Sequence, residues 1–267
     1  MDSTRVTFEN SRDMELVGIV THPEDVEHDD DTVQRPGAIL SHSFTGFKEI
    51  PHLKALAEEL ADRGIIAFRF DFSDCVGESD GTCENMTLTN QIDDLENAIN
   101  YFESRGDVDP AGIGLAGHSL GGMTSILVAA DDDRSKAIVP IAAPANHEEE
   151  KLFQGKEIDR WEEMGHTHFP TVKRGEVKIG WQFYEDLQQY DALDVVGDID
   201  VPIRFVHGTD DEIVPFANSE ELFDHATEPK DLHAVEDADH LFRQPSHEEE
   251  MVAATADWME EHLVSGT

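Results

Sequence analysis

The sequence contains few cysteines and no long apolar runs, and both absences narrow the class of protein. Only two cysteines, Cys75 and Cys83, occur in 267 residues, which excludes a scaffold built on disulfides. No segment approaches 18 uninterrupted apolar residues, and residues 1–18 lack the basic and then apolar pattern of a secretion signal. We therefore expect a cytoplasmic protein with no membrane contact and two free thiols, a small disulfide or redox pair being the alternative.

Positive charge is also scarce. The chain has 19 Lys and Arg residues against 59 Asp and Glu residues, a formal net charge of −40. Acidic runs occur along the whole chain, for example at 24–31, 131–133 and 148–150. Such a charge excludes nucleic acid or an anionic membrane as a partner. Because the charge is dispersed and not gathered in a tail, the composition resembles that of proteins from salt-accumulating halophiles, in which salt screens the repulsion.

Strand and helix signals alternate along most of the chain. A hairpin is expected from 6–8 and 16–21, and amphipathic helices from 51–63 and 88–102. A helix closes the chain at 248–263. Buried strands are expected at 38–42, 65–72, 113–116, 137–143, 201–207 and 232–235. This alternation predicts a single α/β domain over 1–267, with a mostly parallel sheet and helices on both faces.

The alternation fails between 145 and 190, where the sequence is polar, aromatic and irregular. In open α/β sheets ligands bind beyond the carboxyl ends of the strands, so an insertion leaving a strand there is placed to cover the site. We expect 145–190 to form a cap or lid, a solvated surface elaboration being the alternative. His166 and His168 have no carboxylate or thiol at a matching spacing, so a metal site is not expected there.

One serine is enclosed by glycines in the stretch GIGLAGHSLGGMTSILVAA, residues 112–130. An apolar strand precedes Ser119 and apolar residues at helical spacing follow it, so Ser119 lies at a sharp turn from strand to helix. Gly117 and Gly121 suit so tight a turn, and the first N–H groups of the helix suit a developing negative charge. The sequence favours a serine nucleophile over a helix N-cap serine beside packing glycines.

An acid and a base follow the serine in the chain. Asp210 and Asp211 come after the buried strand at 201–207, and His240 lies in a loop before the last helix. Nucleophile, acid and base thus occur in the order Ser, Asp, His, each just beyond the end of an expected strand.

These segments resemble the α/β-hydrolase fold superfamily, especially the small serine esterases and the cinnamoyl-esterase-like and dienelactone-hydrolase-like proteins. GHSLGG is similar to that family's nucleophile turn, HGTDDEIVP to its acid loop and DADHLF to its histidine loop. The resemblance implies a triad of Ser119, Asp211 and His240. It also implies that SHSFTGFKE, 41–49, supplies the Phe44 N–H to an oxyanion hole completed by the Leu120 N–H. No cofactor or metal is implied.

Two residues depart from the family pattern. Ser43 and Asp74 each stand where glycine is usual, and the loop at 73–81 is one residue longer. We expect hydrolysis of a carboxylic ester of a small-molecule acyl substrate through an acyl-enzyme. Thioesterase, lactonase, peptidase and cofactor-free perhydrolase activities remain alternatives, as does a non-catalytic binder with the same fold. The oligomeric state is left open.

Overall fold

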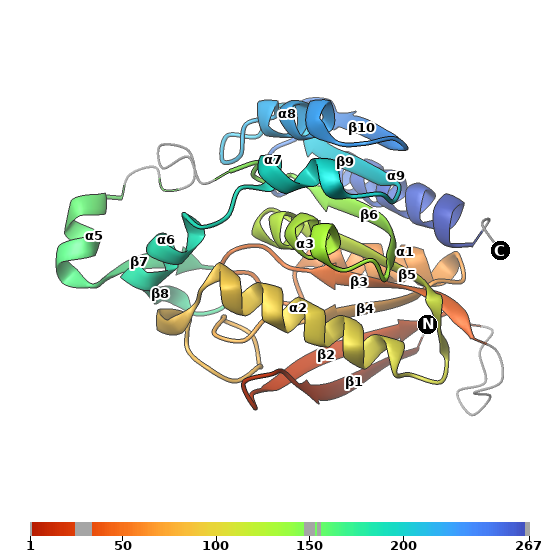
Figure 1. Cartoon of the computed structure of the whole chain (residues 1–267), viewed down its shortest axis with the longest axis horizontal. Helices are drawn as coiled ribbons and strands as arrows, with labels where there is room; N and C mark the ends of the chain where they lie inside the picture. Colours follow the sequence, from red (N-terminus) through yellow and green to blue (C-terminus); the bar gives the residue numbers. More distant parts are fainter. Residues whose placement is uncertain (1, 25–33, 147–152, 154–155, 265–267) are drawn as a thin grey trace.

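The computed structural model describes residues 2–24, 34–146, 153 and 156–264, so the acidic run at 148–150 lies outside it. An eight-stranded sheet forms the centre of the molecule (Figure 1), with strand order β1-β2-β4-β3-β5-β6-β9-β10. The strands of this sheet are β1 Asp2–Glu9, β2 Glu15–His22, β3 Arg35–Ser41, β4 Ile66–Phe70, β5 Val108–His118, β6 Ser135–Ile141, β9 Ile203–Gly208 and β10 Lys230–Val235.

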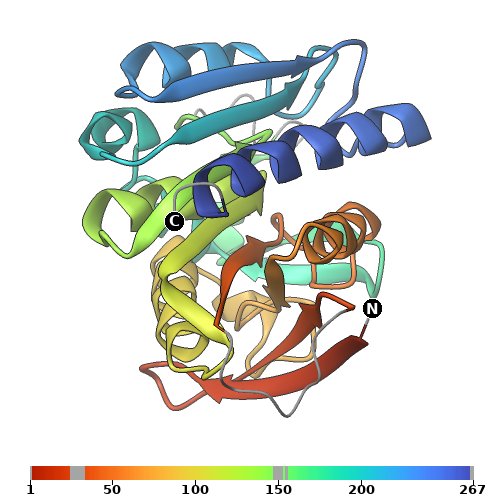
Figure 2. The same ribbon diagram turned by 90° about the vertical axis from the view of Figure 1, so that its right-hand side faces the viewer.

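The six strands from β4 to β10 in that order pair in parallel, whereas β1 and β2 form an antiparallel hairpin whose second strand pairs antiparallel with β4. The described helices are α1 Pro51–Asp62, α2 Leu88–Glu103, α3 Leu120–Asp131, α5 Ile158–Met164, α6 Trp181–Leu187, α7 Ala192–Val195, α8 Ala217–His225 and α9 Pro245–Leu263, with 3-10 turns η1 Cys83–Asn85 and η2 Val196–Asp198. Helices α2 and α3 cover one face of the sheet, and α1 and α9 cover the other (Figures 1 and 2). The prediction of a mostly parallel α/β sheet with helices on both faces is confirmed.

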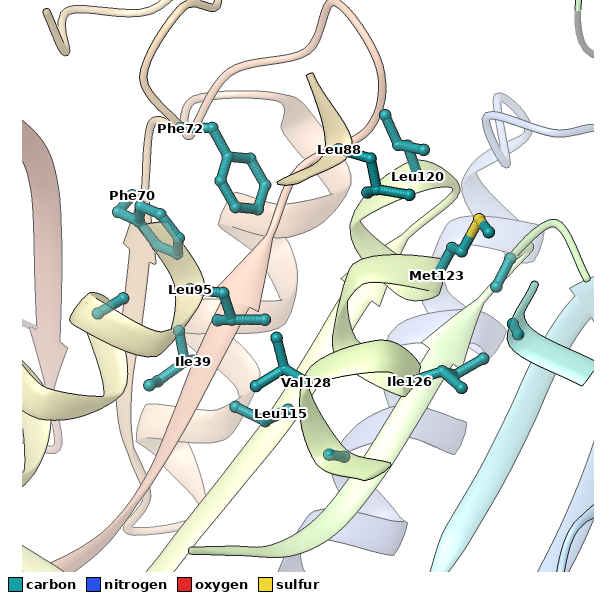
Figure 3. Close-up of a cluster of buried hydrophobic side chains, with 14 of the residues drawn as sticks. Ile39, Phe70, Phe72, Leu88, Leu95, Leu115, Leu120, Met123, Ile126 and Val128 are labelled. Atoms are coloured by element: carbon teal, nitrogen blue, oxygen red, sulfur yellow. The ribbon is translucent and has the colours of Figure 1, made fainter. Parts of the chain in front are cut away.

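Side chains alternate between the two faces of the central strands, as the two-residue period of a strand requires. In β3, Ile39 packs with α2 and α3, whereas Ala38 and Leu40 pack with α1 and α9. Figure 3 shows the first of these layers, with Leu95 of α2 and Val128 of α3 beside the sheet. Both faces of these strands are therefore buried, which explains their nearly continuous apolar sequence.

Three features of the fold differ from the sequence expectation. Strand β5 begins at Val108, five residues before the expected start. Its first part was not predicted because Pro110 and Gly112 are residues that sequence patterns associate with the ends of strands. Helix α8 was not expected. The insertion is also more regular than predicted: it holds α5, an antiparallel hairpin of β7 His166–Thr171 and β8 Gly175–Gly180, and α6.

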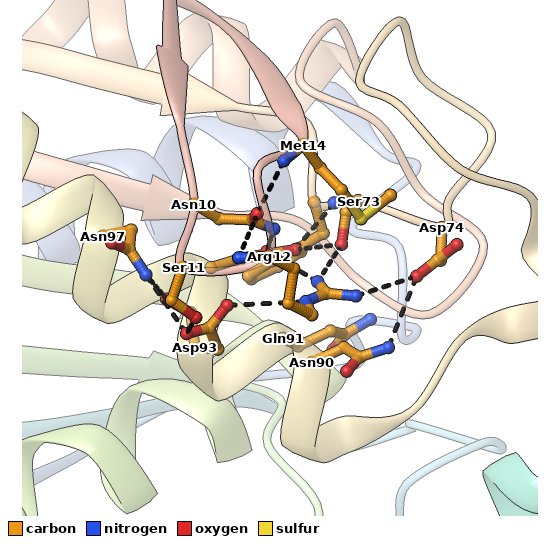
Figure 4. A network of polar contacts seen from close by, with 12 residues as sticks. Asn10, Ser11, Arg12, Met14, Ser73, Asp74, Asn90, Gln91, Asp93 and Asn97 are labelled. Carbon is orange, nitrogen blue, oxygen red and sulfur yellow. Dashed lines mark hydrogen bonds and ion pairs between the residues drawn. The ribbon is translucent and has the colours of Figure 1, made fainter.

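Asp74 occupies its glycine-like position because its backbone is left-handed, with φ of 57°. Glycine adopts this region freely and Asp tolerates it better than most residues. Arg12, in the turn between β1 and β2, binds Asp74 at 3.3 Å (Figure 4). It also binds the fully buried Asp94 of α2 at 3.0 Å. Ser73 donates to Asp94 through both its N–H and its hydroxyl. The departure from glycine is thus compensated by an ion-pair network that fixes the loop after β4.

Two further observations bear on the expectations from composition. Cys75 and Cys83 are buried and carry free thiols, as expected. None of the described helices combines the length and apolar character needed to cross a bilayer.

Candidate active site

Ser119 lies at a strained turn between β5 and α3. Its backbone has φ of 55° and ψ of −119°, which non-glycine residues rarely adopt. Such a conformation costs about 1–3 kcal/mol and persists only where the surroundings impose it. Here the Ser119 N–H donates to the Ile141 carbonyl at 2.7 Å, and the Ser119 carbonyl accepts from the N–H groups of Gly122 and Met123. The turn therefore holds the serine in a fixed, strained orientation.

The glycines around Ser119 are required by close backbone contacts. A Cβ atom at Gly117 would lie 2.2 Å from the Gly121 carbonyl oxygen. A Cβ atom at Gly121 would lie 2.6 Å from the carbonyl oxygens of both Ser41 and His42. Side chains at either position would thus collide with backbone atoms that cannot easily move. The serine turn is consequently packed directly against the segment that follows β3.

The two candidate acids differ sharply in their surroundings. Asp211 is buried, and its Oδ2 accepts a hydrogen bond of 2.6 Å from Nδ1 of His240. Asp210 is exposed to solvent. The Oδ1 atom of Asp211 accepts from the N–H groups of Ile213 and Val214, each at 2.8 Å. The structure thus joins Asp211, and not Asp210, to His240.

A second histidine, His207, also binds Asp211. Its Nε2 lies 2.8 Å from the Val214 carbonyl oxygen and 3.1 Å from Asp211 Oδ2. Because a carbonyl only accepts, Nε2 carries the proton, and Nδ1 accepts from the Ser219 hydroxyl at 2.7 Å. Burial alone would raise the pKa of Asp211, but the donors on His207 and His240 hold that pKa well below its ordinary value.

Sequence reasoning did not single out His207 as a functional residue. The available signal was its place as the first residue of HGTDDEIVP, immediately before the glycine of the acid loop. A Cβ atom at that glycine, Gly208, would lie 2.3 Å from the Ala238 carbonyl oxygen. The acid loop and the histidine loop therefore touch at this point.

The two candidate oxyanion donors flank the serine turn. No hydrogen bond joins the N–H of Phe44 or Leu120 to another residue of the described chain. The segment from His42 is held by its histidine, whose Nδ1–H donates to the Ser43 carbonyl and whose Nε2 accepts from the Phe72 N–H. Ser43 keeps an ordinary negative φ, so the departure from glycine does not force a left-handed backbone there.

A buried ion pair connects the segment 41–49, which carries Phe44, to the loop after β4. Lys48 and Asp71 are both almost fully buried, and Lys48 Nζ lies 2.6 Å from Asp71 Oδ2. Asp71 Oδ1 also accepts from the Lys48 N–H at 2.7 Å. Although burial alone would raise the pKa of Asp71, the hydrogen bonds and positive charge of Lys48 lower it. Removing one partner of such a pair typically costs about 3–5 kcal/mol, because a buried charge is left uncompensated.

Ser119, Leu120, Phe44 and His240 all line one cavity of about 710 Å³. Its walls are largely apolar and aromatic. The insertion contributes a group of apolar side chains to these walls, namely Phe153, Phe169, Pro170, Val172, Phe183 and Leu187. The ring of Phe44 lies 5.0 Å from that of Phe183 and 4.9 Å from that of Phe169. The insertion thus packs on the segment that carries a candidate oxyanion donor.

The comparisons with known proteins agree with this arrangement. The family model described as "Prolyl oligopeptidase family" matches residues 77–266. The chain is 29% identical over 250 residues to "Putative esterase YitV" of Bacillus subtilis (strain 168), covering 85% of this chain and 89% of that protein. It is 27% identical over 194 residues to the human mitochondrial "Palmitoyl-protein thioesterase ABHD10", covering 71% of this chain and 61% of that protein.

Among solved structures, the chain is similar to Est1E from Butyrivibrio proteoclasticus, solved with ferulic acid bound. The TM-score is 0.82 at 24% identity, covering 97% of this chain and 99% of that one. The shared architecture and the family match of more than two thirds of the chain lead to one conclusion. The chain belongs to the prolyl oligopeptidase family and is a hydrolase of the α/β-hydrolase fold.

Proposed function

We propose that the protein hydrolyses carboxylic esters through an acyl-enzyme formed on Ser119. His240 Nε2 takes the hydroxyl proton as Ser119 Oγ attacks the ester carbonyl carbon. The N–H groups of Phe44 and Leu120 bind the oxyanion, and His240 returns the proton to the departing alcohol. Water, activated by the same imidazole, then releases the acid and restores Ser119.

The observation that carries this proposal is the 2.6 Å hydrogen bond between His240 Nδ1 and the buried carboxylate of Asp211. Because Nδ1 donates to Asp211, the tautomer of the neutral imidazole leaves Nε2 free to accept a proton. Ser119 and His240 border the same cavity, and a strained backbone presents the serine to it. A structural serine would gain nothing from that strain.

The cavity supports an apolar acyl group as the preferred substrate. The exposed surface of its walls is mostly apolar and includes six phenylalanines, and a volume of about 710 Å³ lies in the range of small-molecule sites. We propose that 145–190 acts as a cap over this site, because its aromatic side chains supply one wall. The net charge of −40 disfavours polyanionic substrates, which the surrounding field would repel.

Thioester hydrolysis is the second candidate, favoured by the similarity to a thioesterase across 71% of the chain. The same acyl-enzyme serves both reactions, and they differ only in the leaving group. Matched p-nitrophenyl esters and neutral thioesters of rising acyl length, assayed at high salt, separate the two by kcat/KM. An acyl preference that peaks at short, polar groups would contradict the proposed apolar site.

The nucleophile is tested with Ser119→Ala. We expect ester hydrolysis to fall at least about 10⁴-fold and labelling by a fluorophosphonate probe to disappear, because no other group replaces the attacking oxygen. The thermal midpoint should not fall, since a small hydroxyl is removed from the edge of a cavity. Residual activity above a few per cent would exclude Ser119 as nucleophile. A wild-type protein that is never labelled would favour the non-catalytic binder.

A further inference from the structure

His118 links the serine turn to the histidine loop, defined here as residues 236–242 between β10 and α9. It is the last residue of β5, directly precedes Ser119 and is fully buried. Its Nε2 lies 2.8 Å from the backbone carbonyl oxygen of His240, which is 122 residues away in the sequence. Because that carbonyl can only accept, His118 Nε2 carries the proton and donates it.

Ring contacts continue this link on both sides. The His118 ring centroid lies 4.8 Å from that of His240 and 6.3 Å from that of Phe242, so it touches two side chains of the histidine loop. On its other side it lies 4.6 Å from the ring of His52, in the first turn of α1. His118 therefore fills the space between α1 and the histidine loop.

Packing alone does not account for a histidine at this position. The Nδ1 atom of His118 is buried and has no hydrogen-bond partner among the described residues, and the same holds for Nε2 of His52. A buried acceptor without a partner is unfavourable, and a phenylalanine of similar shape would avoid that cost. What phenylalanine could not supply is the N–H donated to the His240 carbonyl.

The neutral form of both rings also suits this place. Burial lowers the pKa of His118 well below its ordinary value and lowers that of His52 to about 4. A cation at either ring would oppose the positive charge that forms on His240 when it takes the serine proton. Neutral rings allow contact with His240 without that penalty.

We propose that His118 is a positioning residue that holds the backbone of His240, and thereby its Nε2, in line with Ser119 Oγ. This inference rests on the proposed function, because it assigns His118 a part in acyl transfer. Its hydrogen bond joins the element carrying the nucleophile to the loop carrying the base. A displacement of about 1 Å between reacting groups can lower a rate by roughly 100-fold. Loss of this one hydrogen bond should therefore lower kcat.

The test compares two variants of His118. His118→Phe keeps the shape of the ring and loses the N–H donor, whereas the side-chain amide of His118→Gln is long enough to donate to the His240 carbonyl. His118→Asn carries the same amide on a side chain too short to reach it. Thr255→Val is the matched control, because it removes a buried donor in α9 away from the site. Each variant is assayed for kcat and KM on a p-nitrophenyl ester, for thermal midpoint and for amide hydrogen exchange over 236–244.

We expect His118→Phe to lower kcat by about 10- to 100-fold, with KM within about threefold, and to speed exchange over 236–244. We expect His118→Gln to recover most of the loss and Thr255→Val to change neither kcat nor local exchange. If His118→Phe does not fold, the test is the difference in kcat and in hydrogen exchange between His118→Gln and His118→Asn. The inference would be overturned if His118→Phe had the kcat and the hydrogen exchange of the wild type. It would also be overturned if His118→Gln recovered no more kcat than His118→Asn.

Failure of the proposed function gives a different pattern. A wild-type protein that neither hydrolyses esters nor reacts with fluorophosphonate would refute acyl transfer, whatever the His118 variants do. Hydrogen exchange over 236–244 would still report whether His118 holds the loop.

Discussion

The central sheet and the insertion at 145–190 are stabilised in different ways. In the sheet, regular alternation sends side chains to two buried layers, between α2 and α3 on one face and α1 and α9 on the other. In the insertion, Trp161 packs edge-on against Phe153, Phe169 and Trp181, with ring centroids 5.5–5.8 Å apart. Order in the sheet thus comes from periodicity, whereas order in the insertion comes from a local aromatic cluster.

Charge separates the two regions as well. The insertion holds six of the 19 Lys and Arg residues in 46 positions, so cations are concentrated in it. Lys156 lies 4.2 Å from the centre of the Phe169 ring, a geometry in which the cation is attracted to the ring face. Most of the net negative charge is therefore carried by the sheet and its helices. The insertion is chemically the less acidic part of the molecule.

The sharpest comparison within the sheet region is between the two neighbouring aspartates. We expect Asp211→Asn to lower kcat by about 10⁴-fold, because the amide no longer holds His240 in the productive tautomer. Asp210→Asn is the matched control, and its exposed side chain predicts a change of no more than about twofold. Steady-state kinetics of both variants measure this, and the reverse ranking would contradict the assignment of Asp211.

A second pair of variants tests whether the sheet mainly determines stability and the insertion mainly determines substrate binding. Leu115→Ala removes a fully buried side chain of β5, and we expect a loss of about 2–5 kcal/mol in the free energy of unfolding with little change in KM. Phe169→Ala removes a ring that borders an existing cavity, so it widens that space and does not create a new one.

For Phe169→Ala we expect a smaller loss of about 1–2 kcal/mol and a KM for apolar esters raised several-fold. Denaturant unfolding and steady-state kinetics give both quantities for each variant. Equal losses of stability with unchanged KM in Phe169→Ala would show that the cap does not contribute to binding.

The smallest effect concerns salt. We expect the thermal midpoint to rise between 0.1 M and about 1 M KCl, as the Debye length falls from about 10 Å to about 3 Å and repulsion among carboxylates is screened. A further rise toward 3 M would come from cation binding or stronger apolar burial. Sucrose at equal concentration is the control for solute exclusion. A midpoint that is flat or falls with KCl would refute the proposed halophilic character.

The sequence predicted the sheet well because its strands and helices are each buried against a neighbouring layer. The hairpin, the strands at β3, β6, β9 and β10, and the long helices α2 and α9 lie close to their expected positions. The candidate site was also identifiable, because Ser119, Asp211 and His240 lie in the segments that follow β5, β9 and β10. Ser119 and His240 lie on one cavity, and Asp211 hydrogen-bonds His240, although their roles in catalysis remain predictions.

The contributions of His52, His118 and His207 were not predictable in the same way. His52 and His118 depend on contacts across long sequence separations, such as His118 with the carbonyl of His240. His207 makes only local contacts, with Asp211, Val214 and Ser219, and its signal was its place in the acid-loop motif. The hairpin of β7 and β8 was missed for a related reason. Only a few of its side chains, such as Phe169, Val177 and Ile179, are buried. The hairpin packs on the short turn η1, on Phe44 and on neighbouring parts of the insertion, and not against a continuous layer.

The surroundings of Asp211 determine where a mobile proton can go. Its two oxygens accept from four donors, His240 Nδ1, His207 Nε2 and the amides of Ile213 and Val214. A carboxylate has about four lone-pair directions, so none is left for an added proton without the loss of a donor. In the proposed reaction we therefore expect the proton that leaves Ser119 to stop on His240, while Asp211 stays an anion.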